Sequence, residues 1–112
     1  MTGTELREIA KITDTDLGYE EHGIFSANLT LDYGGSGQSA GGYNLGNPEV
    51  GFGVAFIKGI LGACGVQSWE QVKGRTVLAI KDDRMGRVLG LENLPTEPGK
   101  RFMFADLVAE YV

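Results

Sequence analysis

The sequence predicts a single α+β domain over residues 1–112, built on an antiparallel sheet of about four to five strands with a central helix and, at the C-terminal end, a segment that fits a second helix. Three observations predict this class. Residues 24–33 alternate like a strand, residues 52–64 carry an apolar stripe at helical spacing, and two short apolar runs follow at 76–80 and 87–91. Strands and helices in this order favour an antiparallel sheet over a parallel one. A chain of 112 residues has too little length for a second core.

The first element expected is a β-hairpin over residues 6–33. Its second strand alternates between apolar and polar side chains, which is typical of a strand with one buried face. The apolar positions are Phe25, Ala27, Leu29, Leu31 and Tyr33. Residues 16–23 read DLGYEEHG and supply the turn, while Ile9 and Ile12 mark the partner strand.

The glycines concentrate between Gly34 and Gly65. We expect a loop over residues 34–47, followed by a helix that Asn47 caps and in which Pro48 occupies the first turn. Gly65 is placed to end this helix. The apolar stripe consists of Phe52, Phe56, Ile57, Ile60, Leu61 and Cys64.

Three glycines inside this helix each cost about 1 kcal/mol of helix stability relative to alanine. They are Gly53, Gly59 and Gly62. Glycine at this density allows another backbone to approach closely. The approaching backbone belongs either to the domain's own sheet or to a second copy of the chain.

The remaining elements follow in short segments. Ser68 and Gln71 fit a capping box at the start of a helical turn over residues 68–74. Strands are expected at residues 76–80 and 87–91, joined by a turn at 82–86. Pro95 and Pro98 interrupt a loop, and residues 101–112 fit either a helix or a terminal strand.

The loop Gly34–Leu45 is the first candidate binding element. It reads GGSGQSAGGYNL, which technically contains the dinucleotide-binding pattern G-x-G-x-x-A. No helix opens after this pattern, which argues against a dinucleotide-binding site. No Lys-Ser/Thr pair follows the glycines, which argues against a Walker A phosphate-binding loop. Backbone N–H groups freed of side chains can instead wrap an anionic or amide-bearing ligand. A plain connection between elements is the alternative. The candidate ligand-binding residues here are Gly35, Ser36, Gly37, Gln38 and Tyr43.

A cluster of basic residues is the second candidate. It comprises Lys73, Arg75, Lys81, Arg84 and Arg87, with Lys100 and Arg101 farther along the chain. Arg84, Arg87 and Arg101 are the candidate ligand contacts, since a guanidinium can grip a phosphate through two hydrogen bonds. An ordinary solvated surface is the alternative.

Other chemistry is disfavoured. His22 lies in a charged turn and Cys64 lies on the apolar stripe, so neither fits a nucleophile–base pair or a metal site. We therefore expect no enzyme, no metal and no cofactor. A net charge of −5 disfavours both general nucleic-acid binding and a polybasic membrane anchor. No apolar signal core is visible, which indicates an intracellular protein.

Several strings resemble a family of small proteins from tailed phages and prophages. They run from Leu17-Gly18-Tyr19-Glu20-Glu21-His22-Gly23-Ile24, through Leu29–Gln38 and Gly41-Gly42-Tyr43, to Phe56-Ile57, Ile60-Leu61, Gly65-Val66 and Ser68–Gly74, within residues 8 to 92. That family is similar to the Thoeris anti-defence sponges, which bind cyclic ADP-ribose-type immune signals without cleaving them and assemble into dimers or rings. The resemblance implies a homo-oligomer in the host cytoplasm. It also makes Tyr43, Phe102, Arg84, Arg87 and Arg101 eligible to hold the nucleotide.

The leading hypothesis is thus a non-enzymatic phage immune-evasion protein that sequesters a cyclic nucleotide-type signal. The alternative is an anti-CRISPR-type inhibitor that blocks a host defence complex through an acidic face containing Asp14, Asp16, Glu20 and Glu21. A minor virion or housekeeping component is a third hypothesis.

Overall fold

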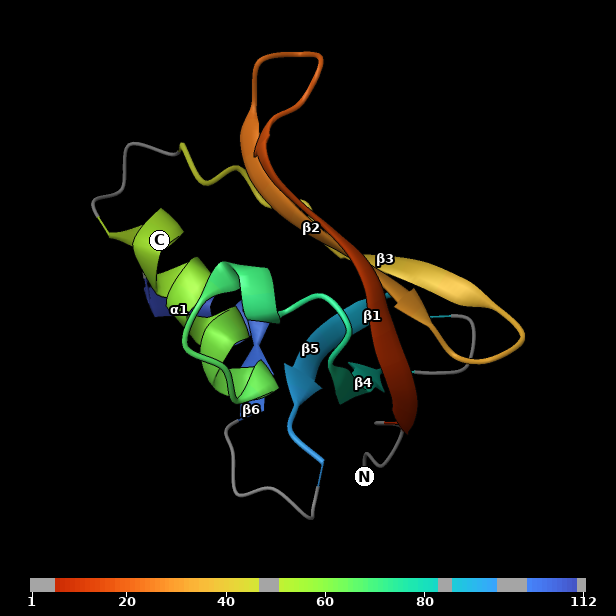
Figure 1. The fold of residues 1–112 in the computed structure, drawn as a ribbon. Coiled ribbons are helices and arrows are strands. Elements are labelled where there is room, and N and C mark those ends of the chain that lie inside the picture. Colours follow the sequence, from red (N-terminus) through yellow and green to blue (C-terminus); the bar gives the residue numbers. More distant parts are fainter. Residues whose placement is uncertain (1–5, 47–50, 83–85, 95–100, 111–112) are drawn as a thin grey trace.

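The computed structural model describes residues 6–46, 51–82, 86–94 and 101–110, and Figure 1 shows their arrangement. The predicted α+β class is confirmed, with six strands instead of four to five. The elements are β1 (Leu6–Tyr19), β2 (Phe25–Asp32), β3 (Gly37–Gly41), α1 (Phe52–Cys64), β4 (Thr76–Lys81), β5 (Val88–Glu92), β6 (Arg101–Met103) and α2 (Phe104–Glu110), with a 3-10 turn at Trp69–Gln71.

The six strands form one antiparallel sheet in the order β3-β2-β1-β4-β5-β6. The long strand β1 serves both halves of this sheet. Its first half, from Leu6 to Lys11, pairs with β4, whereas its second half, from Lys11 to Tyr19, pairs with β2. An irregularity in the β1–β2 register between Ile12 and Asp14 marks the change, and such bulges bend a strand.

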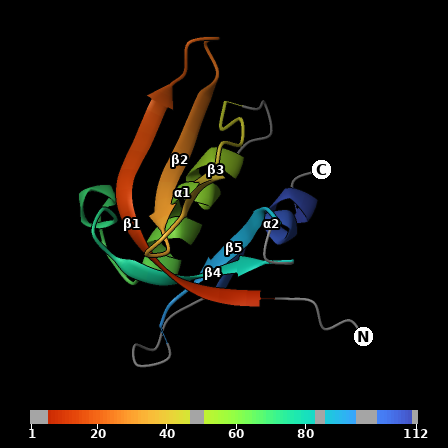
Figure 2. The same ribbon diagram turned by 90° about the vertical axis from the view of Figure 1, so that its right-hand side faces the viewer.

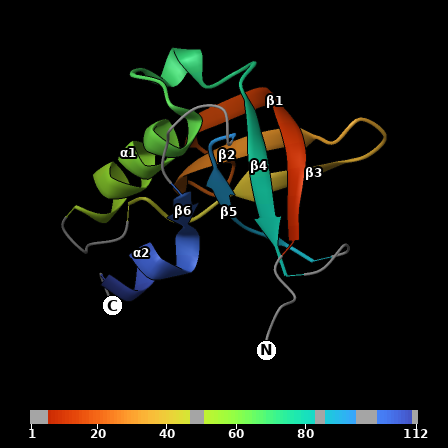
Figure 3. The ribbon, with the colours of Figure 1, turned by 90° about the horizontal axis from the view of Figure 1, so that it is seen from below.

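This bend curls the sheet into a partly open barrel. Figures 2 and 3 show β1, β2 and β3 folding over β4 and β5, and β3 comes to lie beside β5 although the two strands are not neighbours in the sheet order. Five strands in the order β3-β2-β1-β4-β5, with a helix between the third and fourth, are arranged as in an OB-type barrel.

The core lies between the inner face of this barrel and α1. The predicted inward face of β2 is confirmed, because Ala27, Leu29 and Leu31 are buried. Phe56, at most 1% exposed, is the central core residue of α1. The centroid of its ring lies 5.4, 5.4 and 5.5 Å from the ring centroids of Tyr43, Phe102 and Phe104.

The C-terminal end of α1 agrees with its prediction, and its N-terminal end starts later than expected. Gly65 has a φ of 68°, and the N–H groups of Gly65 and Val66 donate to the carbonyls of Gly62 and Leu61. At the other end, α1 begins at Phe52 after Gly51. The predicted cap at residues 47–48 lies outside the described residues.

Two glycines of α1 show that the predicted close approach occurs within the chain. A Cβ on Gly59 would meet the Phe102 ring at 2.7 Å, and a Cβ on Gly53 would meet the Leu45 carbonyl oxygen at 2.8 Å. Real Cβ atoms essentially never come this close to other heavy atoms. Both positions therefore exclude a side chain because β6 and the segment after β3 press on the helix.

The predicted loop at residues 34–47 needs correction, because it contains strand β3. This short strand forms by pairing Gly37–Gly41 with Asp32–Asn28 of β2. The C-terminal alternatives both occur, as β6 is followed directly by α2. The capping at Ser68 is confirmed, since Gln71 Oε1 accepts the Ser68 N–H at 3.2 Å. At 13 and 7 residues, α1 and α2 are too short to cross a bilayer, and the described chain has no longer helix.

Candidate functional site

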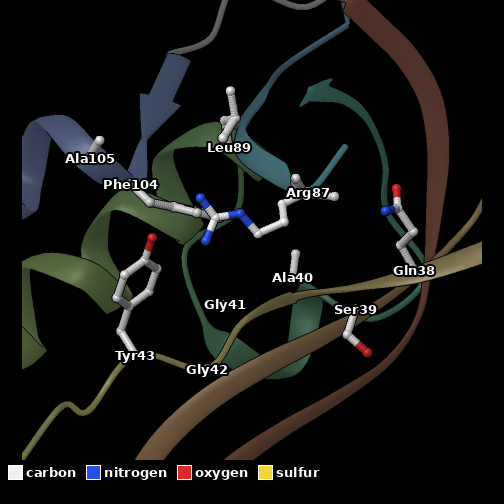
Figure 4. Close-up of a pocket in the computed structure, with 11 residues that line it drawn as sticks. Gln38, Ser39, Ala40, Gly41, Gly42, Tyr43, Arg87, Leu89, Phe104 and Ala105 are labelled. Atoms are coloured by element: carbon white, nitrogen blue, oxygen red, sulfur yellow. The ribbon is translucent and has the colours of Figure 1, made fainter. Parts of the chain in front are cut away.

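A pocket of about 450 Å³ lies where β3 passes the start of β5. Figure 4 shows it in close-up. Three segments line it: residues 38–43 from β3 and the backbone just after it, residues 87–89 at the start of β5, and residues 104–105 at the start of α2. Ala40 and Val88 belong to the buried core, whereas Arg87 and Gly42 are exposed. The pocket therefore reaches from the surface to the inner layer of the barrel.

Strand β3 presents backbone polar groups to this pocket. The bonds Tyr33 N–H to Ser36 O and Gly42 N–H to Ala27 O, both 2.8 Å, show which residues of the β2–β3 pair exchange hydrogen bonds. Because bonding alternates along an antiparallel pair, the N–H and C=O groups of Ser39 and Gly41 face away from β2, toward β5. These groups are available to a ligand between the two strands.

Gly41 cannot be replaced without moving this wall. Its φ is 97°, a left-handed value that other residues rarely adopt. A Cβ there would also collide with the carbonyl oxygen of Ala27 on β2. Glycine at this position lets β3 leave the sheet and continue to Tyr43.

Arg87 supplies the charge of the pocket. Figure 4 shows its side chain extending across the pocket, with the guanidinium on the side of Tyr43 and Phe104. The described residues that line the pocket include this one base and no acid. Arg87 makes no hydrogen bond or ion pair with any described residue, whereas Arg7, Lys73 and Lys81 pair with carboxylates.

Aromatic side chains form one wall. The Tyr43 ring packs against Phe56 and Phe104, with centroids 5.4 and 5.7 Å apart, which holds the ring in place. Its hydroxyl points toward the side of the pocket where the Arg87 guanidinium lies (Figure 4). Leu89 adds an aliphatic side chain at a β-bulge, since Ile80 pairs with Gly90 and Lys81 with Val88. The pocket thus combines a flat apolar surface with a cation.

A partly buried chain of polar side chains closes the end of the pocket at Gln38. The Gln38 amide accepts from the Tyr33 hydroxyl at 2.6 Å and donates to the Gly86 carbonyl at 3.0 Å. Lys81 Nζ lies 4.5 Å from the centre of the Tyr33 ring and 2.7 Å from Glu8 Oε1. Burial, and secondarily the Glu8 charge, raises the pKa of Tyr33 to about 12, so its hydroxyl keeps the proton that it donates.

The bases of the predicted basic cluster that the structure describes do not share one surface. Lys81 is only 3% exposed and faces the barrel interior. Arg75 points toward the end of α1, where its Nε donates to the Cys64 carbonyl at 3.1 Å. Arg84 lies outside the described residues. Of the described bases in this group, Arg87 alone lines the pocket.

The structure brings three of the predicted ligand-binding residues together, namely Gln38, Tyr43 and Arg87. Gly35 and Ser36 lie in the turn before β3, and neither they nor Gly37 lines the pocket. Arg101 is exposed on β6 opposite Glu92, also outside the pocket.

The backbone of residues 39–42 belongs to the predicted binding loop, whereas sequence reasoning missed the side chains of Val88, Leu89, Phe104 and Ala105. Val88 and Leu89 lay in a predicted strand, and Phe104 lay in the predicted terminal element. Nothing in the local sequence of those elements indicated that they would lie beside β3.

The other reactive side chains do not form a site. Burial raises the pKa of the Cys64 thiol to about 11, with Arg75 opposing the shift in part, so the thiol is protonated and covered. His22 is exposed in the β1–β2 turn beside Glu20, with Nδ1 3.5 Å from Oε2. In the described ranges, no three His, Cys, Asp or Glu side chains gather as metal ligands.

The outer face of β2 and β3 is uncharged or acidic. OB-type barrels bind oligonucleotides on this face, where lysine and arginine contact phosphates. Residues 25–32 and 37–41 contain no lysine or arginine, and Asp32 is exposed among them. The seam beside Arg87 is therefore a better candidate site than this face.

No family model, no curated protein and no solved structure matches this chain. Its function has to be inferred from the pocket and from the sequence.

Proposed function

We propose that the protein binds a small anionic ligand of the cyclic nucleotide type in the β3–β5 pocket and sequesters it unchanged. One observation carries this proposal. Arg87 stands without an acidic partner among the described residues at a pocket with no acidic lining, in a chain whose net charge is −5. A cation left unpaired in an acidic protein is suited to an anion supplied from outside.

The polar groups suit a phosphate. The Arg87 guanidinium can donate two parallel hydrogen bonds to phosphate oxygens. The N–H groups of Ser39 and Gly41 face the same space and add neutral donors. Hydrogen bonds to a charged group contribute about 1.5–3 kcal/mol each, and of these donors Arg87 alone also carries a positive charge.

The size and the apolar wall suit a nucleoside. Sites for small molecules usually enclose about 300–1,000 Å³, and this pocket holds about 450 Å³. Phe104 is 2% exposed, so the half-buried Tyr43 and Leu89 side chains provide the apolar surface for a ring, and the Tyr43 hydroxyl can bond to a base or a ribose. The pocket thus matches a compact nucleotide better than a polymer.

The lining of the pocket supports the proposal that the ligand is released unchanged. Among the residues that the structure describes, the lining contains no histidine, cysteine or carboxylate that could act as general base or nucleophile. Such a protein lowers the free concentration of a signal by binding alone. Its role would be phage immune evasion in the host cytoplasm as a homo-oligomer, in line with the resemblance to the anti-defence sponges.

Calorimetry with cyclic ADP-ribose isomers and cyclic dinucleotides tests the proposal. Arg87→Gln should weaken binding about 10- to 100-fold, the loss of one charge-assisted contact. Lys58→Gln is the matched control, because Lys58 is exposed on α1 and outside the pocket, yet its loss changes the net charge equally. Heating the complex should return intact ligand. Absence of heat with every probe, or equal losses in both variants, would refute the proposal.

An acidic hairpin supports the second candidate, a protein-interaction inhibitor. Figure 1 shows the end of the β1–β2 hairpin projecting from the rest of the fold. Asp14 and Asp16 lie on its outer side opposite Thr30 and Asn28, and Glu21 is exposed in its turn. Replacing Asp14, Asp16 and Glu21 with their amides should abolish capture of a host nuclease complex if this candidate holds, and should leave nucleotide binding unchanged if the first holds.

A further inference from the structure

The barrel is not closed by backbone hydrogen bonds. In the sheet of the described residues, β3 is bonded to β2, while β5 is bonded to β4 and β6. The seam between β3 and β5, which contains the pocket, is spanned at one end by the hydrogen bond from Gln38 Nε2 to the Gly86 carbonyl. At the other end, Tyr43 packs on Phe104.

The orientation of the Gln38 amide is determined by its partners. The Gly86 carbonyl can only accept, so the amide nitrogen must face it. The amide oxygen must then face the Tyr33 hydroxyl, which donates its proton at 2.6 Å. Lys81 Nζ lies over the Tyr33 ring and is itself held by Glu8. Contacts from β1, β2 and β4 therefore hold the Gln38 side chain independently of its bond to Gly86.

The Gly86 carbonyl belongs to the same planar peptide unit as the Arg87 nitrogen. A bond that fixes this oxygen also restrains the Arg87 nitrogen and Cα, the two atoms from which the Arg87 side chain is built out over the pocket. We infer that Gln38 is a positioning residue, which holds the seam at its open end and orients Arg87 over the pocket. The sequence had suggested Gln38 as a direct ligand contact, but its amide is engaged on both sides.

Hydrogen exchange tests this inference without any ligand. Gln38→Leu keeps the size of the side chain and removes both bonds, of which the bond to Gly86 spans the seam. Loss of that one hydrogen bond should raise hydrogen exchange of the Arg87–Leu89 amides about 3- to 10-fold. Exchange of the Ala10 and Val77 amides, in the β1–β4 pair, should change less. Tyr33→Phe should act in the same direction more weakly, because it leaves the Gln38–Gly86 bond in place.

The binding experiment rests on the proposed function. Gln38→Leu should weaken binding of cyclic ADP-ribose about 3- to 10-fold alone, and should add little to Arg87→Gln in the double variant, because it acts through Arg87. A full additional loss in the double variant would mean direct contact with the ligand and would overturn the inference.

The two proposals can fail separately. If the wild-type protein binds no probe, the proposed function fails while the exchange measurement still decides the role of Gln38. If exchange at Arg87–Leu89 is unchanged in both Gln38→Leu and Tyr33→Phe, the positioning role is refuted whatever the binding result.

Discussion

Substitution of Gly59 by alanine should destabilise the protein, although the same change stabilises an ordinary helix. The new Cβ would lie 2.7–2.8 Å from three atoms of the Phe102 ring. Carbon atoms in favourable contact are about 3.5–4.0 Å apart, so the ring would have to move by close to 1 Å. Phe56 and Phe104 pack edge-on against it at 5.4 Å each and oppose that movement.

The expected magnitude follows from two opposing terms. Alanine gains about 1 kcal/mol over glycine inside a helix. Overpacking a core costs about 1–3 kcal/mol. Gly59→Ala should therefore lower the free energy of unfolding by up to about 2 kcal/mol. Urea unfolding followed by circular dichroism and by the fluorescence of Trp69 measures this value.

A double variant separates the two terms. Phe102→Leu removes the flat ring that meets Gly59, and in that background Gly59→Ala should become neutral or stabilising by about 1 kcal/mol. The change of sign is the decisive result. If Gly59→Ala stabilises the wild-type protein by about 1 kcal/mol, β6 does not press on α1 and the packing argument is wrong.

Three further results are expected. The Tyr33 phenol contributes its full share of stability below pH 10 and loses it as the pH rises toward 12, because only the unfolded state releases the phenol proton in this range. In urea unfolding at increasing pH, Tyr33→Phe should remove this part of the fall in the unfolding midpoint. Cys64 should react with a disulfide reagent on the order of 100-fold more slowly in the native state than in urea, because its thiol is buried and its pKa is about 11. Gly65→Ala should cost about 1–2 kcal/mol in thermal unfolding, since φ is 68° and a Cβ would lie 2.9 Å from the Asn93 amide nitrogen. Equal results for variant and wild type would contradict the Tyr33 and Gly65 expectations, and equal reaction rates in the native protein and in urea would contradict the one for Cys64.

Elements with a local cause could be predicted from the sequence. The alternation along β2 reports its buried face directly, and Gly65 reports the end of α1. Strand β3 has no such signal, because the sequence GQSAG is poor in residues that favour strands. It becomes a strand because β2 offers it an open edge, and that pairing depends on tertiary structure.

The site shows the same division. Tyr43 and Arg87 could be selected as ligand-binding residues by their chemistry, but their meeting depends on the curl of a sheet that begins at the bend in β1. Lys81 could have been placed correctly, because it continues the inward alternation of Val77 and Ala79. Grouping it with nearby bases along the chain ignored that period of two.

The double pairing of β1 sets the order in which the protein assembles. The β1–β2 hairpin can form as soon as residues 6–32 leave the ribosome, whereas the first half of β1 must wait for β4. Glu8 of that half pairs with Lys81, which lies 73 positions farther along the chain. Contacts of such separation form slowly. Until β4 arrives, residues 6–11 are a bare strand edge that can pair with another nascent chain. Yield on refolding should therefore fall with protein concentration, and the ribosome-bound N-terminal half should be the segment that most needs a chaperone.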